Sequence, residues 1–250
     1  MLLGTGAVVS LLRLARVTPR AARNRWLLAG WGILLLSLAG ARLGYCLERF
    51  PYFARHPLEG LAFWQGGLNW QGAVVGAFAA LFLVNRLSKI PFLALLDATS
   101  VMLLPLAVTA WLGAWTEGVA YGMALPPGTW WGLPSKDVYG QVGLFAPLPL
   151  GASLSLLIFI GIAETGAARF KRKGVMGAMI WLIFSLIMLL FTWLRADPSP
   201  MWLHLRLETW FGLASTGGFL VLCLKLTLAK QPGREATVSD SMDRAKDVPL

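Results

Sequence analysis

The basic residues of this chain fall in every second gap between long apolar segments, and this alternation constrains its fold more than any single motif does. We expect the apolar segments near residues 1–15, 26–46, 68–87, 91–112, 147–166, 174–194 and 207–228. Basic clusters follow the first, third, fifth and seventh of them, within residues 13–25, 86–89, 169–173 and 225–246. The other gaps hold Arg49, Arg55, Lys136, Arg195 and Arg206. Because basic loops remain on the cytoplasmic side, the chain is predicted to start outside, cross seven times and end inside.

The composition supports this prediction. Hydrophobic residues make up 57% of the 250 residues, and charged residues make up only 14%. A soluble domain of this length cannot bury so much apolar surface, so the sequence predicts an all-α, polytopic membrane protein with seven transmembrane helices. The net charge of +10 then reflects orientation and attraction to anionic lipids, and it argues against a nucleic-acid partner.

The few cysteine and histidine residues point to no metal or cofactor. Cys46 and Cys223 are predicted to lie in different spans near opposite membrane faces, so we expect no disulfide between them. His56 and His204 are the only histidines, and neither belongs to a cluster with metal-ligand spacing. No metal site and no cofactor are therefore predicted.

The chain is predicted to form one transmembrane domain, residues 1–230, followed by a disordered cytoplasmic tail, residues 231–250, rich in Asp, Ser and Lys. Residues 1–12 are uncharged and precede the first arginines, which is the reverse of a signal peptide and predicts an uncleaved helix. Two long gaps, residues 47–67 and 113–146, are rich in Trp, Tyr and Phe. Because these side chains favour the membrane–water interface, both are expected to lie flat on the external face.

Arg42 and Asp97 lie inside predicted spans, where ionisable side chains are costly. Arg42 is near the external end of the second span. It could snorkel to the headgroups, or it could face a cavity and meet a lipid phosphate or an acidic partner. Asp97 lies one to two turns into the fourth span, where a structural ion pair or a carboxylate at a helix start is expected. Beyond the sixth span, Arg195 and Asp197 are expected to form a local ion pair.

The segment 65–76 contains the densest polar and glycine signal. Gly66 and Gly67 are predicted to break the chain before the third span, and Gly72 and Gly76 to form a face for close helix packing. Asn69 and Gln71 require partners, because an unpaired amide in a membrane costs free energy.

Several motifs, taken in order and spacing, resemble the prolipoprotein diacylglyceryl transferase family. They are Gly-Ala-Arg-Leu-Gly-Tyr at 40–45, Trp-Gln-Gly-Gly-Leu-Asn-Trp-Gln-Gly at 64–72, Ile-Pro-Phe at 90–92 with Asp97, Gly-Val-Ala-Tyr-Gly at 118–122, Pro147, and Leu-Arg-Ala-Asp-Pro at 194–198. The resemblance implies a multi-pass protein of the bacterial cytoplasmic (inner) membrane, active in lipoprotein biosynthesis. Members of the family transfer a diacylglyceryl group from phosphatidylglycerol to the cysteine of a lipoprotein precursor.

This chain departs from the family where the polar catalytic residues are expected. Gln71 stands in place of a histidine, Trp111 in place of an arginine, and Met188 and Thr192 in place of an arginine and a glutamate. Glu117 remains as a candidate catalytic base, whereas the amide of Gln71 cannot accept a proton near neutral pH. The resemblance implies that the residues for binding lipid or phosphate are Arg42, Tyr45, Gly66, Gly67, Gly118, Tyr121 and Arg195.

Two functional hypotheses follow. In the first, the protein is a diacylglyceryl transferase-like protein with weak activity, or a pseudoenzyme with none. Its partners are then a phosphatidylglycerol-like phospholipid and a lipoprotein precursor. In the second, it is a non-catalytic lipid-binding or scaffold protein on the same fold. An active site would bring Arg42, Arg195 and Glu117 to one pocket. A scaffold would instead have Trp111 and Met188 packed into that space.

Overall fold

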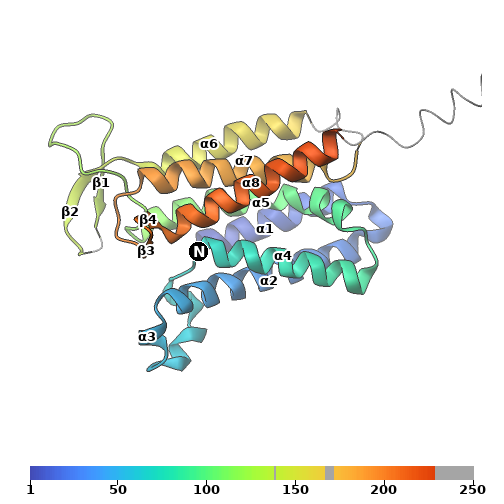
Figure 1. Ribbon diagram of the computed structural model, residues 1–250, viewed down its shortest axis with the longest axis horizontal. Coiled ribbons are helices and arrows are strands. Elements are labelled where there is room, and N and C mark those ends of the chain that lie inside the picture. Colours follow the sequence, from blue (N-terminus) through green and yellow to red (C-terminus); the bar gives the residue numbers. More distant parts are fainter. Residues whose placement is uncertain (138, 167–171, 229–250) are drawn as a thin grey trace, which may run out of the picture.

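The structure is a computed structural model that describes residues 1–137, 139–166 and 172–228. Long helices run side by side along its longest axis (Figure 1). In the described residues they are α1 (Leu2–Val17), α2 (Arg23–Glu48), α4 (Trp70–Ser88), α5 (Phe92–Thr116), α6 (Leu148–Thr165), α7 (Val175–Leu194) and α8 (Leu207–Leu228). The tail predicted at 231–250 lies outside the described residues.

Short elements gather at one end of the bundle, on the left in Figure 1. After α2 come the helix α3 (Phe50–Phe53) and two 3₁₀ helices, η2 (Pro57–Leu61) and η3 (Phe63–Gln65); a third 3₁₀ helix, η1 (Arg20–Ala22), precedes α2. Strand β1 (Leu133–Lys136) pairs antiparallel with β2 (Val142–Phe145), and β3 (Met201–Trp202) pairs with β4 (Leu205–Arg206). The chain is therefore mostly helical rather than wholly helical, because part of the second aromatic-rich segment, 113–146, forms a hairpin.

Six helices in the described part of the chain are long and apolar enough to cross a membrane: α2 with η1, and α4 to α8. The predicted first span corresponds to α1, which has 16 residues and is not one of these six. It nevertheless packs along α5, and its Leu14 is fully buried. Seven crossings with the N-terminus outside thus remain a prediction.

The connections alternate between the two ends of the bundle. The turns from α1 to α2 and from α4 to α5, which carry the clusters at 13–25 and 86–89, lie opposite the end that carries α3 and the β-hairpins (Figure 1). In these segments the basic turns and the aromatic connections lie at opposite ends of the bundle. Which end faces the cytoplasm stays a prediction.

The interior is built from α5, α6 and α7, whose apolar side chains form one core with parts of α2 and α4. Leu95, Leu156, Ile160 and Ile180 are fully buried in it. The mixture of branched aliphatic and aromatic side chains fills the space by close packing, which drives helix association where lipid removes the hydrophobic driving force.

Helices α2 and α4 cross in close contact at glycines. A Cβ atom on Gly40 would lie 2.3 Å from the carbonyl oxygen of Gly72, and one on Gly76 would lie 2.2 Å from that of Leu36. Any larger residue would push the two backbones apart. The predicted packing role of Gly72 and Gly76 is therefore confirmed.

Asp97 caps a neighbouring helix. Its carboxylate accepts hydrogen bonds from the N–H groups of Gly174, at 2.5 Å, and Gly177, at 2.8 Å, at the start of α7. These donors have no partner within their own helix, and the positive end of the α7 dipole favours a carboxylate there. Of the two roles expected for Asp97, the structure supports a helix-start carboxylate, but the helix is α7 rather than its own α5.

Candidate functional site

Arg42 lies in the last two turns of α2 and is only 8% exposed. Its guanidinium donates hydrogen bonds to the carbonyl oxygens of Glu59 at 2.6 Å, Gly60 at 3.0 Å, Gly66 at 2.7 Å and Gly67 at 3.2 Å. It therefore does not snorkel to the headgroups, but ties the connecting segment 59–67 to α2. All four acceptors are main-chain oxygens, so they satisfy the N–H groups without neutralising the positive charge.

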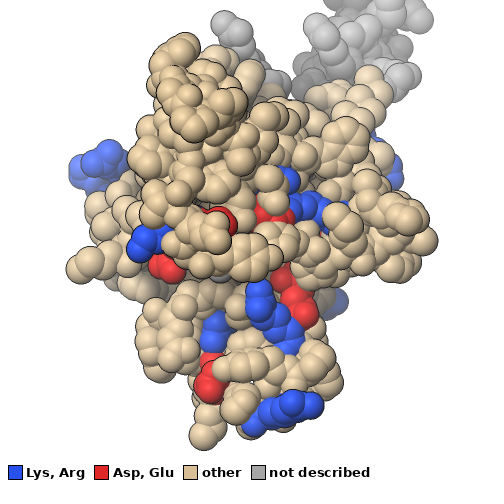
Figure 2. Space-filling view, turned by 90° about the vertical axis from the view of Figure 1, so that its left-hand side faces the viewer, with Lys and Arg blue, Asp and Glu red and all other residues tan. Residues whose placement is uncertain are grey.

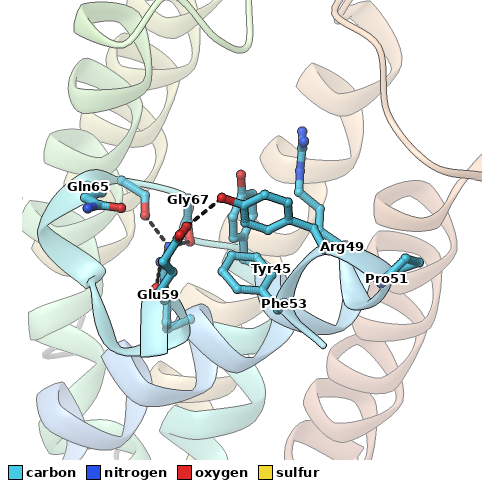
Figure 3. A pocket seen from close by; sticks show the side chains of 10 residues that line it. Tyr45, Arg49, Pro51, Phe53, Glu59, Gln65 and Gly67 are labelled. Atoms are coloured by element: carbon cyan, nitrogen blue, oxygen red, sulfur yellow. Dashed lines mark hydrogen bonds between the residues drawn. The ribbon is translucent and has the colours of Figure 1, made fainter. Parts of the chain in front are cut away.

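A cavity of about 440 Å³ lies between the end of α2 and the connecting segment 59–67 (Figure 3). It is lined by Arg42, Tyr45, Arg49, Pro51, Tyr52, Phe53, Glu59, Gln65, Gly66 and Gly67. Its volume falls within the range of small-molecule sites, which is roughly 300–1,000 Å³. It combines guanidinium groups with aromatic rings and one carboxylate, so it can contact an anionic group that carries an apolar body.

The two arginines of the cavity share an aromatic ring. The Tyr45 ring centroid lies 5.5 Å from the Arg42 guanidinium carbon and 5.3 Å from that of Arg49. Such cation–π contacts hold the guanidinium groups in place. Nearby, the hydroxyl of Tyr52 donates a hydrogen bond of 2.6 Å to Glu59, drawn as a dashed line in Figure 3. That bond raises the pKa of Tyr52 above its ordinary value, because it stabilises the protonated phenol.

Gly66 and Gly67 break the chain before α4, as predicted, with φ angles of +82° and +66°. At Gly67 the requirement for glycine is twofold, since a Cβ atom would also lie 2.4 Å from the Tyr45 ring. This close approach lets the Gly66 and Gly67 carbonyls reach Arg42. Glu117 borders the other side of the turn, with its Oε2 3.8 Å from the position of a Cβ on Gly66.

The two amides of the same motif behave differently. Asn69 caps α4 by accepting a hydrogen bond from the N–H of Gly72 at 2.9 Å, and it donates another to the carboxylate of Glu48. Gln71, the other amide, has its Oε1 buried without a hydrogen-bond partner in the described part of the chain. The side chain of Asn69 is thus paired, as expected, whereas Oε1 of Gln71 is not.

Arg195 is engaged by two carboxylates. It donates to Asp197 at 2.8 Å and 2.5 Å and to Glu208 at 2.8 Å. The predicted ion pair with Asp197 is confirmed, and Glu208 was not foreseen. Burial by itself would raise the pKa of Asp197, but the hydrogen bonds and charge of Arg195, with the charge of Arg206, hold that pKa below its ordinary value.

Gly118 and Tyr121 pack inside the loops at the β-hairpin end of the bundle rather than on the cavity. Gly118 has a φ of +69°, and a Cβ there would lie 2.9 Å from the carbonyl oxygen of Lys136. Tyr121 is buried and its ring lies 4.7 Å from that of Phe145, while its carbonyl accepts a hydrogen bond from Ala196. These residues therefore join the β1–β2 hairpin to the end of α7.

The structure brings together four of the predicted site residues: Arg42, Tyr45, Gly66 and Gly67 all line the cavity. Arg195 and Glu117 are not among its lining residues, so the expected convergence on one pocket is not observed. Trp111 and Met188 are buried at 5% and 7% exposure in the common core, where Trp111 packs edge-on against Phe191.

Six lining residues were missed as site residues: Arg49, Pro51, Tyr52, Phe53, Glu59 and Gln65. For Arg49, Tyr52 and Glu59 the only signal in the sequence was a cluster of aromatic and charged residues directly after a predicted span. Figure 2, which looks onto this end of the molecule, shows acidic and basic side chains next to one another in the middle and lower part of the face, within a mainly uncharged surface.

Comparison with known proteins identifies the family. A family model described as prolipoprotein diacylglyceryl transferase matches residues 1–243. The chain is similar to phosphatidylglycerol–prolipoprotein diacylglyceryl transferases, with 35% identity over 99 residues to that of a Polaromonas species and 30% over 171 residues to that of Thermotoga petrophila. These matches cover 39% and 66% of this chain. They cover 36% and 58% of the two relatives, so the chain spans about half the length of the curated relatives it matches. With its apolar helices, this multi-pass membrane protein belongs to the prolipoprotein diacylglyceryl transferase family.

Proposed function

We propose that this protein is a divergent member of the family that binds an anionic, phosphatidylglycerol-like phospholipid and has weak or no diacylglyceryl transferase activity. The observation that carries the proposal is the state of Arg195, whose charge is balanced by Asp197 and Glu208. A guanidinium held in this way has little capacity left to stabilise a departing phosphate.

The chemistry of the family's reaction supports the same conclusion. The acceptor thiol must lose its proton to become a strong nucleophile, and the negative charge of the leaving phosphate must be stabilised in a dry site. Gln71 cannot act as a base, and Glu117 is exposed at the end of α5. Removing one such electrostatic contact costs about 3–4 kcal/mol of transition-state stabilisation, and further losses add less than their sum.

The packing of the interior also favours loss of activity. Trp111 and Met188 stand where the resemblance implies two arginines, and both are buried among apolar side chains. Bringing a phosphate into such an interior without compensating donors would be strongly unfavourable. The proposed enzyme therefore keeps the helical frame but lacks most of the polar groups that the reaction needs.

Lipid binding without catalysis is the second candidate, and the cavity favours it. Arg42, Tyr45, Gly66 and Gly67 line the cavity together with the exposed Arg49. Its lining therefore contains two guanidinium groups and one carboxylate, that of Glu59. Under this proposal the N-terminus and the cavity face the outside of the bacterial cytoplasmic membrane. A lipoprotein precursor is a partner only if transfer activity persists.

The test is a transfer assay on the full chain in lipid nanodiscs that contain phosphatidylglycerol. A synthetic peptide with a lipoprotein-type cysteine is added, and mass spectrometry detects the diacylglyceryl thioether. We expect product at or only slightly above background level. Complete conversion of the peptide by the wild type that is abolished in Glu117→Ala would overturn the proposal. The matched control is Glu59→Ala, which removes a carboxylate from the cavity instead.

Lipid binding is tested separately by native mass spectrometry of the purified protein. We expect phosphatidylglycerol to be retained in preference to phosphatidylethanolamine, and Arg49→Gln to reduce that preference. Equal retention of both lipids by the wild type would contradict the lipid-binding part of the proposal.

A further inference from the structure

We propose that the segment 57–65, which we call the external arm, is embedded by an apolar ridge in the lipid leaflet at the α3 end of the bundle. The ridge consists of Leu58, Leu61 and Trp64. The proposal rests on the membrane placement of the family's helices, but not on the loss of transferase activity.

The ridge stands out from the arm. Leu58 and Leu61 lie three residues apart in η2, and because a 3₁₀ helix has three residues per turn, they project from the same side. Leu58, Leu61 and Trp64 are 81%, 73% and 72% exposed, whereas Ala62 between them is only 6% exposed. The arm thus has one side against the protein and a large apolar side without a partner in the described chain.

The contacts of the arm set its height along the bundle. Arg42 bonds to the carbonyls of Glu59 and Gly60, and the sulfur of Cys46 lies 3.6 Å from the position of a Cβ on Gly60. Arg42 precedes the end of α2 at Glu48 by about 9 Å, given the rise of 1.5 Å per residue. The arm therefore folds back beside the last two turns of α2 instead of extending beyond the helix.

The surface of α2 at this height is itself apolar. Leu43 and Leu47, which lie in the same two turns as Arg42 and Cys46, are 64% and 71% exposed. They belong to a helix with the length and composition of a membrane span, so lipid is the surrounding that suits them. The arm contacts α2 at the same height, through Arg42 and Cys46, so its exposed ridge meets the same surrounding.

The arm also projects to the side. Figure 1 shows the region around α3 below the level of α2, clear of the other helices. A projection at the end of a membrane bundle lies over lipid rather than over protein. Arg49 and Arg55, which precede the arm in the chain, are exposed, and their positive charge complements anionic headgroups. Trp64 is of a residue type that favours the membrane–water interface. Among the occupants of such a ridge, these features select the lipid leaflet.

The test measures depth with nitroxide spin labels. Leu58→Cys and Leu61→Cys are made singly in full-length protein that carries Cys46→Ser and Cys223→Ser, and each is labelled in nanodiscs of phosphatidylglycerol and phosphatidylethanolamine. The matched references are Leu43→Cys, on the lipid-facing surface of α2, and Lys136→Cys, exposed on the β1–β2 hairpin. The ratio of oxygen to nickel-chelate accessibility reports depth.

We expect both arm labels to give ratios near that of Leu43→Cys and several-fold above that of Lys136→Cys. Ratios on the water side of the midpoint between the references would overturn the proposal. Low access to both reagents would also overturn it, because it would mean that a second protein chain covers the ridge. Neither result depends on the transfer assay, so failure of this inference is distinguishable from failure of the proposed function.

Discussion

Arg195, at the end of α7, donates a hydrogen bond of 2.8 Å to Glu208 in the first turn of α8. The same guanidinium also holds Asp197, so a single side chain joins the end of one helix, the following turn and the start of the next helix. Both Arg195 and Glu208 are largely buried. The buried charge of Arg195 therefore stabilises a helix connection.

Glu208→Ala should destabilise the protein by about 1.5–3 kcal/mol, the range for hydrogen bonds to charged groups. The reason is that part of the Arg195 charge would be left buried without its partner. Thermal unfolding in detergent would measure the effect. Glu117→Ala, at an exposed carboxylate, is the control and should change stability little. Equal effects of the two substitutions would contradict this account.

The stability of this connection should depend on pH through Asp197. Because its folded-state pKa is lowered, its contribution is complete above its ordinary pKa of 3.8. This contribution of Asp197 to stability is lost as the pH falls through the pKa of Asp197 in the folded state. Wild type and Asp197→Asn should therefore differ in unfolding temperature at neutral pH, and the difference should shrink on acidification below about pH 4. A difference that grows on acidification would refute the assignment.

Gly40→Ala should destabilise the contact of α2 with α4, because the new Cβ atom would meet the Gly72 carbonyl oxygen at 2.3 Å. Overpacking of this kind costs about 1–3 kcal/mol. Gly32→Ala in the same helix is a matched control, since nothing lies within 4 Å of its Cβ position. Unfolding in detergent should separate the two variants, and the same loss in both would argue against close packing at Gly40.

Arg42→Lys should loosen the segment 59–67 although it keeps the positive charge. An ammonium group cannot reproduce the planar fork that reaches four carbonyl oxygens. Hydrogen–deuterium exchange should become at least several-fold faster in this segment and stay unchanged in α6. Arg49→Lys, in the same cavity, is the control and should leave the exchange of 59–67 unaltered. Unchanged exchange in Arg42→Lys would show that the four bonds do not hold the segment.

Asp97→Ala should cost about 0.5–2 kcal/mol, the usual range for loss of a helix cap. It would leave the N–H groups of Gly174 and Gly177 at the start of α7 without their acceptor. Asp97→Asn keeps one acceptor oxygen and should lose less. Thermal unfolding of the two variants in detergent measures the order, and a larger loss in Asp97→Asn would contradict the capping role.

The spans that the sequence predicted match the helices closely where hydropathy acts over many residues. The segments expected at 68–87 and 207–228 correspond to α4, Trp70–Ser88, and α8, Leu207–Leu228. Turn chemistry was equally local, since Gly66 and Gly67 have the positive φ angles expected of them. The β1–β2 hairpin was missed, because aromatic richness indicates an interface but does not specify strand pairing.

By itself, the sequence determined that the long apolar segments form helices, where the chain breaks before α4, and which glycines suit close helix contact. Each of these properties depends on neighbouring residues in one segment. Only the tertiary structure decided what the charged residues do: Arg42 meets carbonyls 17 to 25 residues away, and Asp97 meets amides 77 and 80 residues away. Such pairings depend on how helices pack against one another, because separation along the chain carries no information about which buried charges meet.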